Sequence, residues 1–286
     1  MSTDGDGTSG RGALVCGDRT LVLGERTYVM GIVNITPDSF SDGGLFHDPD
    51  VAYRHAMTMF DDGTDIVDIG GESTRPGAQA LDIAEESRRT IPVIERLVAS
   101  GARAISIDTR HGAIARAALE AGAAWVNDVS GLADPDLAPV ASRADALVVM
   151  HNRLAGFAPV EDDVHYDDVV TDVCAELARL VDVAVAGGVA RSKIVIDPGL
   201  GFGKTVAGNV ALMRAVGRLQ TIAPVLLGPS RKRFLGAIAG IEAAADRDAA
   251  TIGACLVAAE QGCDIVRVHD ARGVRQALAI FAEGRP

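Results

Sequence analysis

The chain has 286 residues, of which 48% are hydrophobic and 23% charged, so it can bury a substantial core without disulfides or a structural metal. This composition excludes a disordered, collagen-like or small disulfide-rich protein, and an aromatic content of 4% with 32 glycines argues against an all-β sandwich. Lysine and arginine number 27 against 39 aspartates and glutamates, a formal net charge of −12 that repels nucleic acid and anionic lipid. We therefore expect neither a nucleic-acid partner nor a membrane partner.

The cysteines and the N-terminal segment indicate in which cellular compartment the protein is expected. Cys16, Cys174, Cys255 and Cys263 form no Cys-x-x-Cys pair and have no histidine at metal-binding spacing, so we expect small buried thiols in a reducing environment. Residues 1–12 are polar and glycine-rich, without the apolar region of a signal peptide, and no apolar stretch approaches the length of a membrane span. We predict a flexible tail over 1–12, a single domain over 13–286 and a cytoplasmic location.

Short apolar runs predict the strands in chain order. Residues 14–16 and 20–23 flank the turn pair Gly17-Asp18 and predict a β-hairpin ahead of the main body. Eight further runs alternate with longer segments of helical periodicity, such as the segment that carries Val173 and Leu177 on one face. The eight predicted strands are residues 28–33, 65–69, 104–107, 124–126, 146–150, 193–196, 224–227 and 264–268. Gly63, Gly122 and Gly262 are expected to end three of the helices.

Strands that alternate with helices imply right-handed crossovers and a parallel sheet. Eight such units are the number that closes a (β/α)8 TIM barrel of about 250 residues. An open, doubly wound sheet is the alternative. The barrel is favoured because nearly every predicted strand runs into polar or reactive side chains, which a barrel would bring to one mouth. The predicted fold is therefore an α/β protein, a TIM barrel with a short N-terminal hairpin.

Polar residues at the predicted strand ends suggest a substrate. Asp108, Asn127 and Asp197 each follow an apolar strand, and each alone is typical of a strand-end turn. Together with Lys232 they provide two carboxylates, an amide and an ammonium group. Such a set suits a flat heterocycle that carries N–H donors and a carbonyl acceptor.

The glycine-rich segment that begins at Asp197 also invites a nucleotide-binding interpretation, which its spacing does not support. A P-loop would need glycine in place of Pro198. A dinucleotide motif that begins at Gly199 would need its third glycine in place of Lys204.

Basic residues gather at the last two predicted strands. Ser230-Arg231-Lys232-Arg233 follows the seventh strand, where barrels commonly hold anions, and Arg267 and His269 project to the same side of the eighth. With Arg75 they would give an acidic protein a cationic rim suited to small phosphate or carboxylate substrates. No serine-hydrolase elbow, zinc-protease motif or strand-end cysteine is present, so acyl-enzyme and zinc-hydrolase chemistry have no carrier.

Five motifs resemble, in order and spacing, the signatures of the dihydropteroate synthase family. Residues 31–44, GIVNITPDSFSDGG, are similar to its first-loop signature, and residues 68–77, DIGGESTRPG, to its second. Residues 197–204, 230–232 and 267–270 match the later signatures, so the resemblance spans 28–283. It implies condensation of 6-hydroxymethyl-7,8-dihydropterin diphosphate with 4-aminobenzoate, which gives 7,8-dihydropteroate and diphosphate in folate synthesis. It also implies a Mg²⁺ cofactor, a homodimer and sensitivity of the family to sulfonamides.

The resemblance further implies a role for each matching residue. The pterin is expected against Asp108, Asn127, Met150, Asp197, Lys232 and Arg267, of which Asp108, Asp197 and Lys232 are the implied catalytic residues. The diphosphate is expected against Asn34, Thr74, Arg75, Arg267 and His269, with Asn34 also the Mg²⁺ ligand. The 4-aminobenzoate is expected against Phe40, Thr74, Pro76, Phe202, Ser230 and Lys232.

Two other functions stay open. Methyltransferases that pass a methyl group from a folate to a corrinoid protein share the pterin-binding carboxylates and amide, but have no use for Ser230-Arg231-Lys232 or Thr74-Arg75-Pro76. A non-catalytic pterin-binding paralogue would show degenerate loop residues. Asn152-Arg153 and Pro229 depart from the family pattern and bear on affinity. The glycine- and serine-rich loops 36–46 and 73–80 are expected to be mobile until a diphosphate binds.

Overall fold

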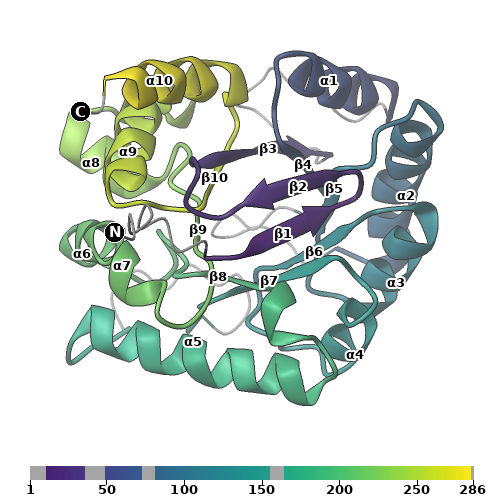
Figure 1. Ribbon diagram of the computed structural model, residues 1–286, viewed down its shortest axis with the longest axis horizontal. Helices are drawn as coiled ribbons and strands as arrows, with labels where there is room; N and C mark the ends of the chain where they lie inside the picture. Colours follow the sequence, from purple (N-terminus) through teal and green to yellow (C-terminus); the bar gives the residue numbers. More distant parts are fainter. Residues whose placement is uncertain (1–10, 36–48, 73–80, 155–163, 285–286) are drawn as a thin grey trace, which may run out of the picture.

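The computed structural model describes residues 11–35, 49–72, 81–154 and 164–284. Eight parallel strands in these ranges form one sheet in the order β8-β7-β6-β5-β4-β3-β10-β9. They are β3 (Tyr28–Asn34), β4 (Ile66–Gly70), β5 (Ile105–Asp108), β6 (Trp125–Asp128), β7 (Ala146–Met150), β8 (Ile194–Asp197), β9 (Leu226–Leu227) and β10 (Ile265–Val268). The sheet closes on itself, because Ile196 of β8 pairs in parallel with Val225 next to β9. The prediction of a TIM barrel is confirmed (Figure 1).

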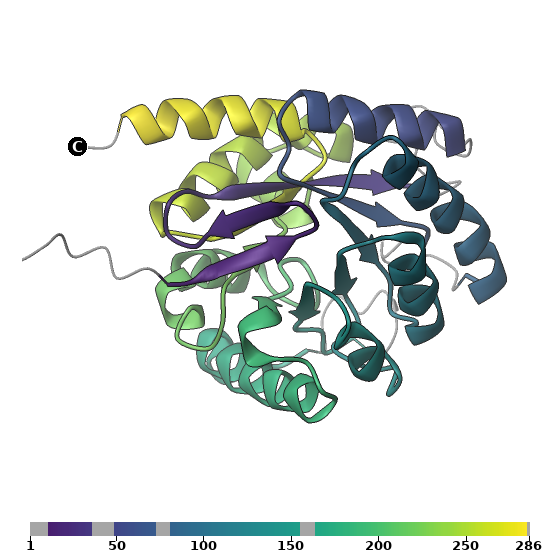
Figure 2. The same ribbon diagram turned by 45° about the vertical axis from the view of Figure 1, so that its right-hand side comes forward.

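Helices surround the barrel (Figures 1 and 2). They are α1 (Pro49–Asp61), α2 (Ile83–Ala99), α3 (Gly112–Ala121), α4 (Leu137–Ala141), α5 (Val169–Ala186), α6 (Val206–Arg214), α7 (Val216–Leu219), α8 (Arg233–Ala239), α9 (Asp248–Glu260) and α10 (Ala271–Glu283). Asp168 caps α5 by accepting a hydrogen bond from the Thr171 N–H at 2.7 Å, which replaces a partner that the first turn lacks. Gly63, Gly122 and Gly262 have φ of 83°, 104° and 76°, as expected for residues that end helices.

Each predicted strand is present, with its ends within two residues of the predicted bounds. β9 is two residues shorter than predicted, at its start. The Val225 N–H donates to the Asp264 carboxylate at 2.9 Å and is therefore withdrawn from the strand ladder.

The interior of the barrel is apolar at the amino ends of the strands and polar at their carboxyl ends. Side chains alternate between the inside and the outside along each strand. At the amino ends, a buried interior cluster contains Met30, Ile66, Trp125, Val148, Val195, Leu226 and Ile265. By the same alternation, the inward-facing positions nearer the carboxyl ends of the strands are occupied by Asp68, Asp108, Asn127, Asp197 and Arg267. Among the described residues, the polar interior positions thus lie toward the carboxyl end of the barrel.

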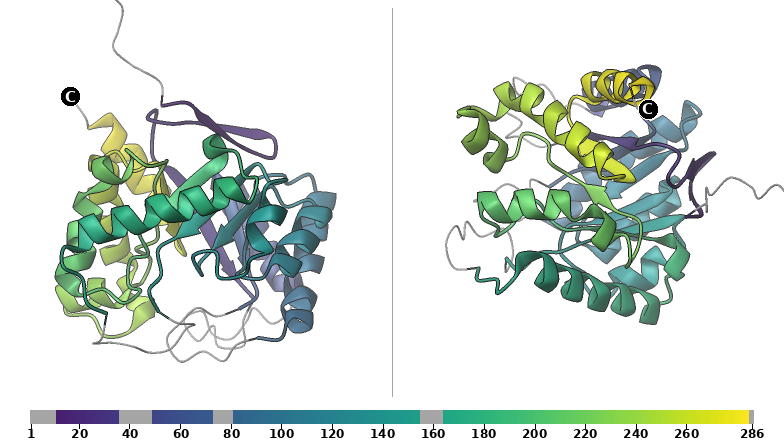
Figure 3. Two further views of the ribbon diagram at one scale, coloured as in Figure 1. Left: turned by 90° about the horizontal axis from the view of Figure 1, so that it is seen from below. Right: turned by 60° about the vertical axis from the view of Figure 1, so that its left-hand side comes forward.

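The predicted hairpin covers the amino end of the barrel. Its strands β1 (Ala13–Cys16) and β2 (Arg19–Val22) pair in antiparallel fashion and lie across that end (Figure 3). Leu14, Cys16 and Leu21 join the interior cluster, and the Trp125 indole N–H donates to the Val15 carbonyl at 2.7 Å. The hairpin therefore closes the apolar half of the barrel interior.

The remaining sequence predictions concern the cysteines, membrane-spanning segments, the N-terminal tail and the mobile loops. Each of the four cysteines has a free thiol, and Cys16, Cys255 and Cys263 are buried, as predicted. Within the described ranges, no helix has both the length and the apolarity that a bilayer span requires. Residues 1–10 and the whole of the two loops expected to be mobile, 36–46 and 73–80, lie outside the described residues. The tail, the domain bounds and the loop mobility therefore stay predictions.

Candidate active site

Six residues that the sequence predicted to meet lie at the carboxyl end of the barrel. Asn34, Asp108 and Asp197 are the last residues of their strands, and Asn127 and Arg267 are the last but one of theirs. Lys232 follows β9 and stands directly before the first residue of α8. Met150, the last residue of β7, joins the same end.

A buried charge network forms the floor of this site. The Arg267 guanidinium donates from Nε to Asp68 Oδ2 at 2.6 Å and from a terminal nitrogen to Asp108 Oδ2 at 2.6 Å. Asn127 Nδ2 donates to the same Asp68 oxygen at 2.8 Å. Asp68 has no exposed surface, and its place in the site was not predicted from the sequence. One arginine therefore holds two carboxylates in place beneath the strand ends.

The network changes the acidity of Asp108. Burial raises the pKa of Asp108 to about 7, although Arg267 acts to lower it, and the neighbouring Asp68 charge raises it further. Two carboxylates that share one cation cannot both ionise without cost. Asp108 therefore changes its charge near neutral pH.

Asp197 and Lys232 form the second charged part of the site. Burial raises the pKa of Asp197, while the Gly199 N–H, which donates to Asp197 Oδ1 at 2.7 Å, acts to lower it. Burial also lowers the pKa of Lys232 to about 8, with Asp197 opposing the shift. The Lys232 ammonium lies 4.2 Å from the centre of the Phe202 ring, a cation–π contact. Phe202, Met150 and Val129 pack together as a small apolar cluster beside these charges.

Ser230 and His269 bind each other at the adjoining edge. The His269 N–H donates to Ser230 Oγ at 3.0 Å, and Ser230 Oγ lies 2.8 Å from His269 Nδ1. The tautomer of the ring decides whether the hydroxyl donates to Nδ1 or Nδ1–H donates to the hydroxyl oxygen. The Ser230 hydroxyl therefore orients His269, a contact that the sequence analysis did not foresee.

Arg231 fixes the backbone between Ser230 and Lys232. Its φ is 56°, in the left-handed region that non-glycine residues rarely adopt. Its guanidinium donates to both oxygens of Asp248 at 2.7 and 2.8 Å, and its N–H donates to Thr251 Oγ1 at 3.0 Å. These bonds to α9 hold the strained turn that aims its two neighbours at the site.

Phe40, Thr74, Arg75 and Pro76 lie outside the described residues, so their predicted roles stay predictions. The ends of the second loop are described. Glu72, directly before it, accepts from the Leu81 N–H at 2.8 Å and from the Arg110 guanidinium at 2.8 and 2.9 Å. The two ends of this loop are thus joined at its base.

One cluster of acidic and histidine side chains has the spacing of a metal site. Atoms of Glu72, Glu86 and His111 lie within 4.8 Å of one another. Arg110 already binds Glu72, while Thr109 Oγ1 donates to Glu86 at 2.7 Å and His111 Nδ1 lies 2.8 Å from its other oxygen. These contacts satisfy the carboxylates, so the cluster is better suited to holding loops than to holding an ion.

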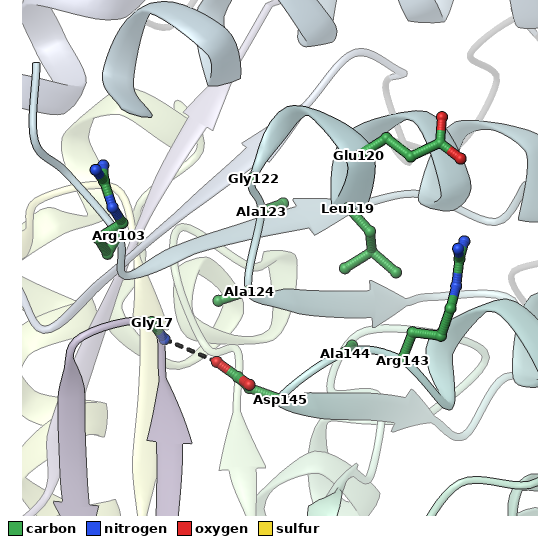
Figure 4. Close-up of a pocket in the computed structure, with 10 residues that line it drawn as sticks. All are labelled: Gly17, Arg103, Leu119, Glu120, Gly122, Ala123, Ala124, Arg143, Ala144 and Asp145. Atoms are coloured by element: carbon green, nitrogen blue, oxygen red, sulfur yellow. Dashed lines mark hydrogen bonds between the residues drawn. The ribbon is translucent and has the colours of Figure 1, made fainter. Parts of the chain in front are cut away.

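A separate cavity of about 280 Å³ lies at the opposite end of the barrel (Figure 4). The segments that precede β5, β6 and β7 line it, together with the hairpin turn, where the Gly17 N–H donates to Asp145 at 2.9 Å. None of the residues predicted for the site lines this cavity. The site is therefore assigned to the carboxyl end of the barrel.

Comparison with known proteins identifies the family. The family model described as pterin binding enzyme matches residues 30–269. The chain belongs to the family of pterin-binding enzymes. Within that family it is 48% identical over 259 residues to a dihydropteroate synthase of Mycobacterium leprae, covering 88% of this chain and 91% of the relative. It is also 46% identical over 243 residues to a probable bifunctional folylpolyglutamate synthase/dihydropteroate synthase of Haloferax volcanii, where it covers 84% of this chain but only 28% of the relative.

Solved structures of the family agree with this assignment. A Xanthomonas albilineans dihydropteroate synthase with 4-aminobenzoic acid has a TM-score of 0.86 and 43% identity, covering 96% of this chain and 99% of that chain. A structure of dihydropteroate synthase from the same organism in complex with 7,8-dihydropteroate has a TM-score of 0.83 and 39% identity, covering 96% and 100%. The resemblance inferred from the motifs is thus confirmed at the level of the whole fold.

Proposed function

We propose that the chain is a dihydropteroate synthase that joins 6-hydroxymethyl-7,8-dihydropterin diphosphate to 4-aminobenzoate. The observation that carries the proposal is the buried set of Asp108, Asn127, Asp197 and Lys232 around the Arg267 network. A pterin edge offers N–H donors to carboxylates and a carbonyl to an ammonium group, and each buried polar group needs such a partner. The Mycobacterium leprae relative and the Xanthomonas albilineans structures support the same function.

In this proposal the pterin lies over the floor of the site. Asp108 and Asp197 accept its amino and ring N–H groups, Lys232 donates to its carbonyl edge, and Asn127 and Met150 complete the contact. Arg267 is committed to Asp68 and Asp108, which supports a role on the pterin side in addition to its predicted diphosphate contact.

The diphosphate is assigned to Asn34, His269, Arg267, Thr74 and Arg75. The amide oxygen of Asn34 is the kind of hard ligand that Mg²⁺ prefers, and Mg²⁺ commonly takes one or two protein oxygens with the rest from phosphate and water. Asn34 and Asp108 both lie close to Gly70. A Cβ atom built on Gly70 would stand 3.3 Å from Asn34 Oδ1 and 3.7 Å from Asp108 Oδ2, so the two side chains are neighbours. The Asn34 oxygen therefore fits Mg²⁺ as a ligand. When bound, the ion would neutralise charge on the leaving diphosphate.

The 4-aminobenzoate is assigned to Phe202, Ser230 and Lys232, with Phe40, Thr74 and Pro76 from the two loops. In the reaction, the carbon–oxygen bond to diphosphate breaks and a carbon–nitrogen bond to the arylamine forms. The amine releases one proton. Asp108 and Asp197 stabilise the positive charge that develops on the pterin, so the protein needs no nucleophile of its own.

A single assay tests the proposal against its two alternatives. Diphosphate release is measured from the pterin diphosphate with Mg²⁺, with and without 4-aminobenzoate. A dihydropteroate synthase releases diphosphate in proportion to 4-aminobenzoate consumed. A non-catalytic paralogue or a folate-dependent methyltransferase would release none, and that result would refute the proposal. The homodimer and the cytoplasmic location stay predictions.

A further inference from the structure

The Lys204 side chain is surrounded by three acceptors. Its ammonium group lies 2.9 Å from the Gly199 carbonyl, 2.9 Å from the Phe202 carbonyl and 3.1 Å from His151 Nδ1. A protonated lysine has three N–H donors, so three acceptors satisfy it completely. Burial lowers the pKa of Lys204 to about 7, with Asp197 opposing the shift, so the three-donor form predominates below that pH.

His151 and Glu176 hold this ammonium group from behind. A protonated lysine can only donate, so His151 Nδ1 accepts and the ring proton lies on Nε2. His151 Nε2 then donates to Glu176 at 3.0 Å. His151 is 1% exposed, and burial lowers its pKa to about 4, which keeps the ring neutral and able to accept. Glu176 in turn binds Arg153, whose guanidinium lies over the Tyr166 ring at 4.1 Å.

Lys204 is one of several contacts that hold this loop. The Gly199 N–H donates to Asp197 Oδ1 and the Gly201 N–H to Asn209 Oδ1, both at 2.7 Å, while Lys204 holds the Phe202 carbonyl. Gly199, Gly201 and Gly203 have φ of 68°, 81° and 60°, which only glycine adopts at little cost. A Cβ at Gly199 would lie 2.1 Å from the His151 carbonyl, so the loop packs directly on the backbone that follows β7. A segment with three such glycines gains much conformational freedom when its closing contact is lost.

Phe202 links Lys204 to the 4-aminobenzoate side of the site. Lys204 binds the Phe202 carbonyl, and the Phe202 ring faces the Lys232 ammonium. A Cβ at Gly201 would stand 3.0 Å from the Lys232 side chain, so the same loop packs along Lys232.

We propose that Lys204, oriented by His151 and Glu176, is a positioning residue for the 4-aminobenzoate side of the site. The inference rests on the proposed function, in which Phe202 and Lys232 contact that substrate. It assigns a task to a lysine to which the proposed function gives no substrate contact.

The strands themselves hold Asp108 and Asp197 on the pterin side, and only Lys232 is shared between the two substrates. The pterin side should therefore depend less on Lys204. The Asp197 carbonyl accepts from the His151 N–H at 2.8 Å, and the Ile196 N–H before it donates to the Pro224 carbonyl at 2.8 Å. Loss of Lys204 should therefore change the two substrates unequally.

The test is Lys204→Met, which keeps the length of the side chain and removes its donors. Below pH 7, we expect the KM for 4-aminobenzoate to rise about tenfold or more, since a hydrogen bond from a charged group is worth roughly a decade in an equilibrium constant. The KM for the pterin diphosphate should change less than about threefold, because a loss smaller than one ordinary hydrogen bond is expected there. Equal changes in both KM values, or no change in either, would overturn the proposal.

Lys193→Met is the matched control. Lys193 is also half-buried, precedes the same strand β8 and donates to the Ala144 carbonyl at 2.8 Å, but at the opposite end of the barrel. It should leave both KM values unchanged. A rise in the KM for 4-aminobenzoate in this control as large as in Lys204→Met would show a general effect of losing a buried lysine.

Two further variants keep the test decisive if Lys204→Met does not fold. Glu176→Gln retains an oxygen that accepts from His151, whereas Glu176→Ala does not. We expect only Glu176→Ala to raise the KM for 4-aminobenzoate. Equal KM values in the two Glu176 variants would contradict the orientation of Lys204 by Glu176 through His151. If the unaltered protein releases no diphosphate, the proposed function itself fails. If it is active but the KM values do not separate, only the role of Lys204 fails.

Discussion

Substitution of Asp68 by asparagine tests the charge network at the floor of the site. Asp68→Asn keeps the shape and removes the charge that meets Arg267 at 2.6 Å and Asn127 at 2.8 Å. Hydrogen bonds to charged groups contribute about 1.5–3 kcal/mol and neutral ones about 1 kcal/mol. Because Arg267 keeps Asp108 as its partner, the free energy of unfolding should fall by only about 2 kcal/mol, below the 3–5 kcal/mol typical of a broken buried pair.

The pH dependence of catalysis distinguishes this electrostatic role from simple packing. The Asp68 charge helps to raise the pKa of Asp108 to about 7. Removing that charge should make Asp108 a stronger acid, so the acid limb of kcat/KM for the pterin diphosphate should move to lower pH. The assay is the pH profile of kcat/KM, which reports the ionisations of the free enzyme.

Asp65→Asn is the matched control for this variant. Asp65 directly precedes the same strand, is 6% exposed and pairs with Arg26 at 2.6 Å, but at the amino end of the barrel. It should lower stability by a similar amount and leave the acid limb in place. An acid limb that does not move in Asp68→Asn, or that moves equally in both variants, would refute the reasoning.

Three further predictions follow from the same contacts. The kcat/KM of the unaltered enzyme should fall below about pH 7, where the Asp108 carboxylate is protonated, and above about pH 8, where the Lys232 ammonium is lost; a flat profile across this range would contradict both assignments. Asp197→Asn should keep the fold but weaken pterin binding by roughly one to two decades, measured by calorimetry, because an amide turns donors toward the ligand N–H groups. Trp125→Phe should lower the free energy of unfolding by about 1 kcal/mol, through loss of the bond to Val15, without change in KM.

The sequence predicted the fold well because its signals are local. The alternation of apolar runs with helical periodicity, and glycines such as Gly122 at helix ends, report directly on backbone geometry. β9 was predicted too long because the bond that shortens it comes from Asp264, far along the chain. A side chain that competes for a strand N–H leaves no local pattern.

The site was predictable where residues stand at strand ends, since parallel strands bring those ends together. Asp68 was missed because it lies inside an apolar strand, and its partner Arg267 is 199 residues away. Its signal was a charged residue within a buried run, on the same face as Gly70 at the strand end. Lys204 was noted as a mismatch to a nucleotide motif and as the end of a family signature, but was given no role, because its partner His151 belongs to a different strand end.

The charges of the site predict a change in the number of bound protons when the pterin diphosphate binds. Asp68, Asp108 and Asp197 face the cations Arg267 and Lys232, and Lys204, whose pKa is about 7, adds only part of a charge near Asp197. The carboxylates are therefore in excess at neutral pH. Asp108 relieves the excess by taking up a proton near pH 7. Pterin N–H donors would replace that proton, because a carboxylate accepts them and a carboxylic acid does not accept them all.

Binding of the pterin diphosphate should therefore release protons. With a pKa of about 7, Asp108 carries about half a proton at pH 7, which sets the largest amount it can release there. Lys232, with a pKa of about 8, is about nine-tenths protonated at that pH and can take up only about a tenth of a proton in return. Calorimetric titrations at pH 7 in buffers of different ionisation enthalpy should give different heats. The difference should reverse in sign as the pH is raised toward 9, because Asp108 is then already ionised and Lys232 takes up about nine-tenths of a proton. The same heat in every buffer at pH 7 would show that Asp108 is ionised before the pterin binds, and the assignment of its proton to the free enzyme would be wrong.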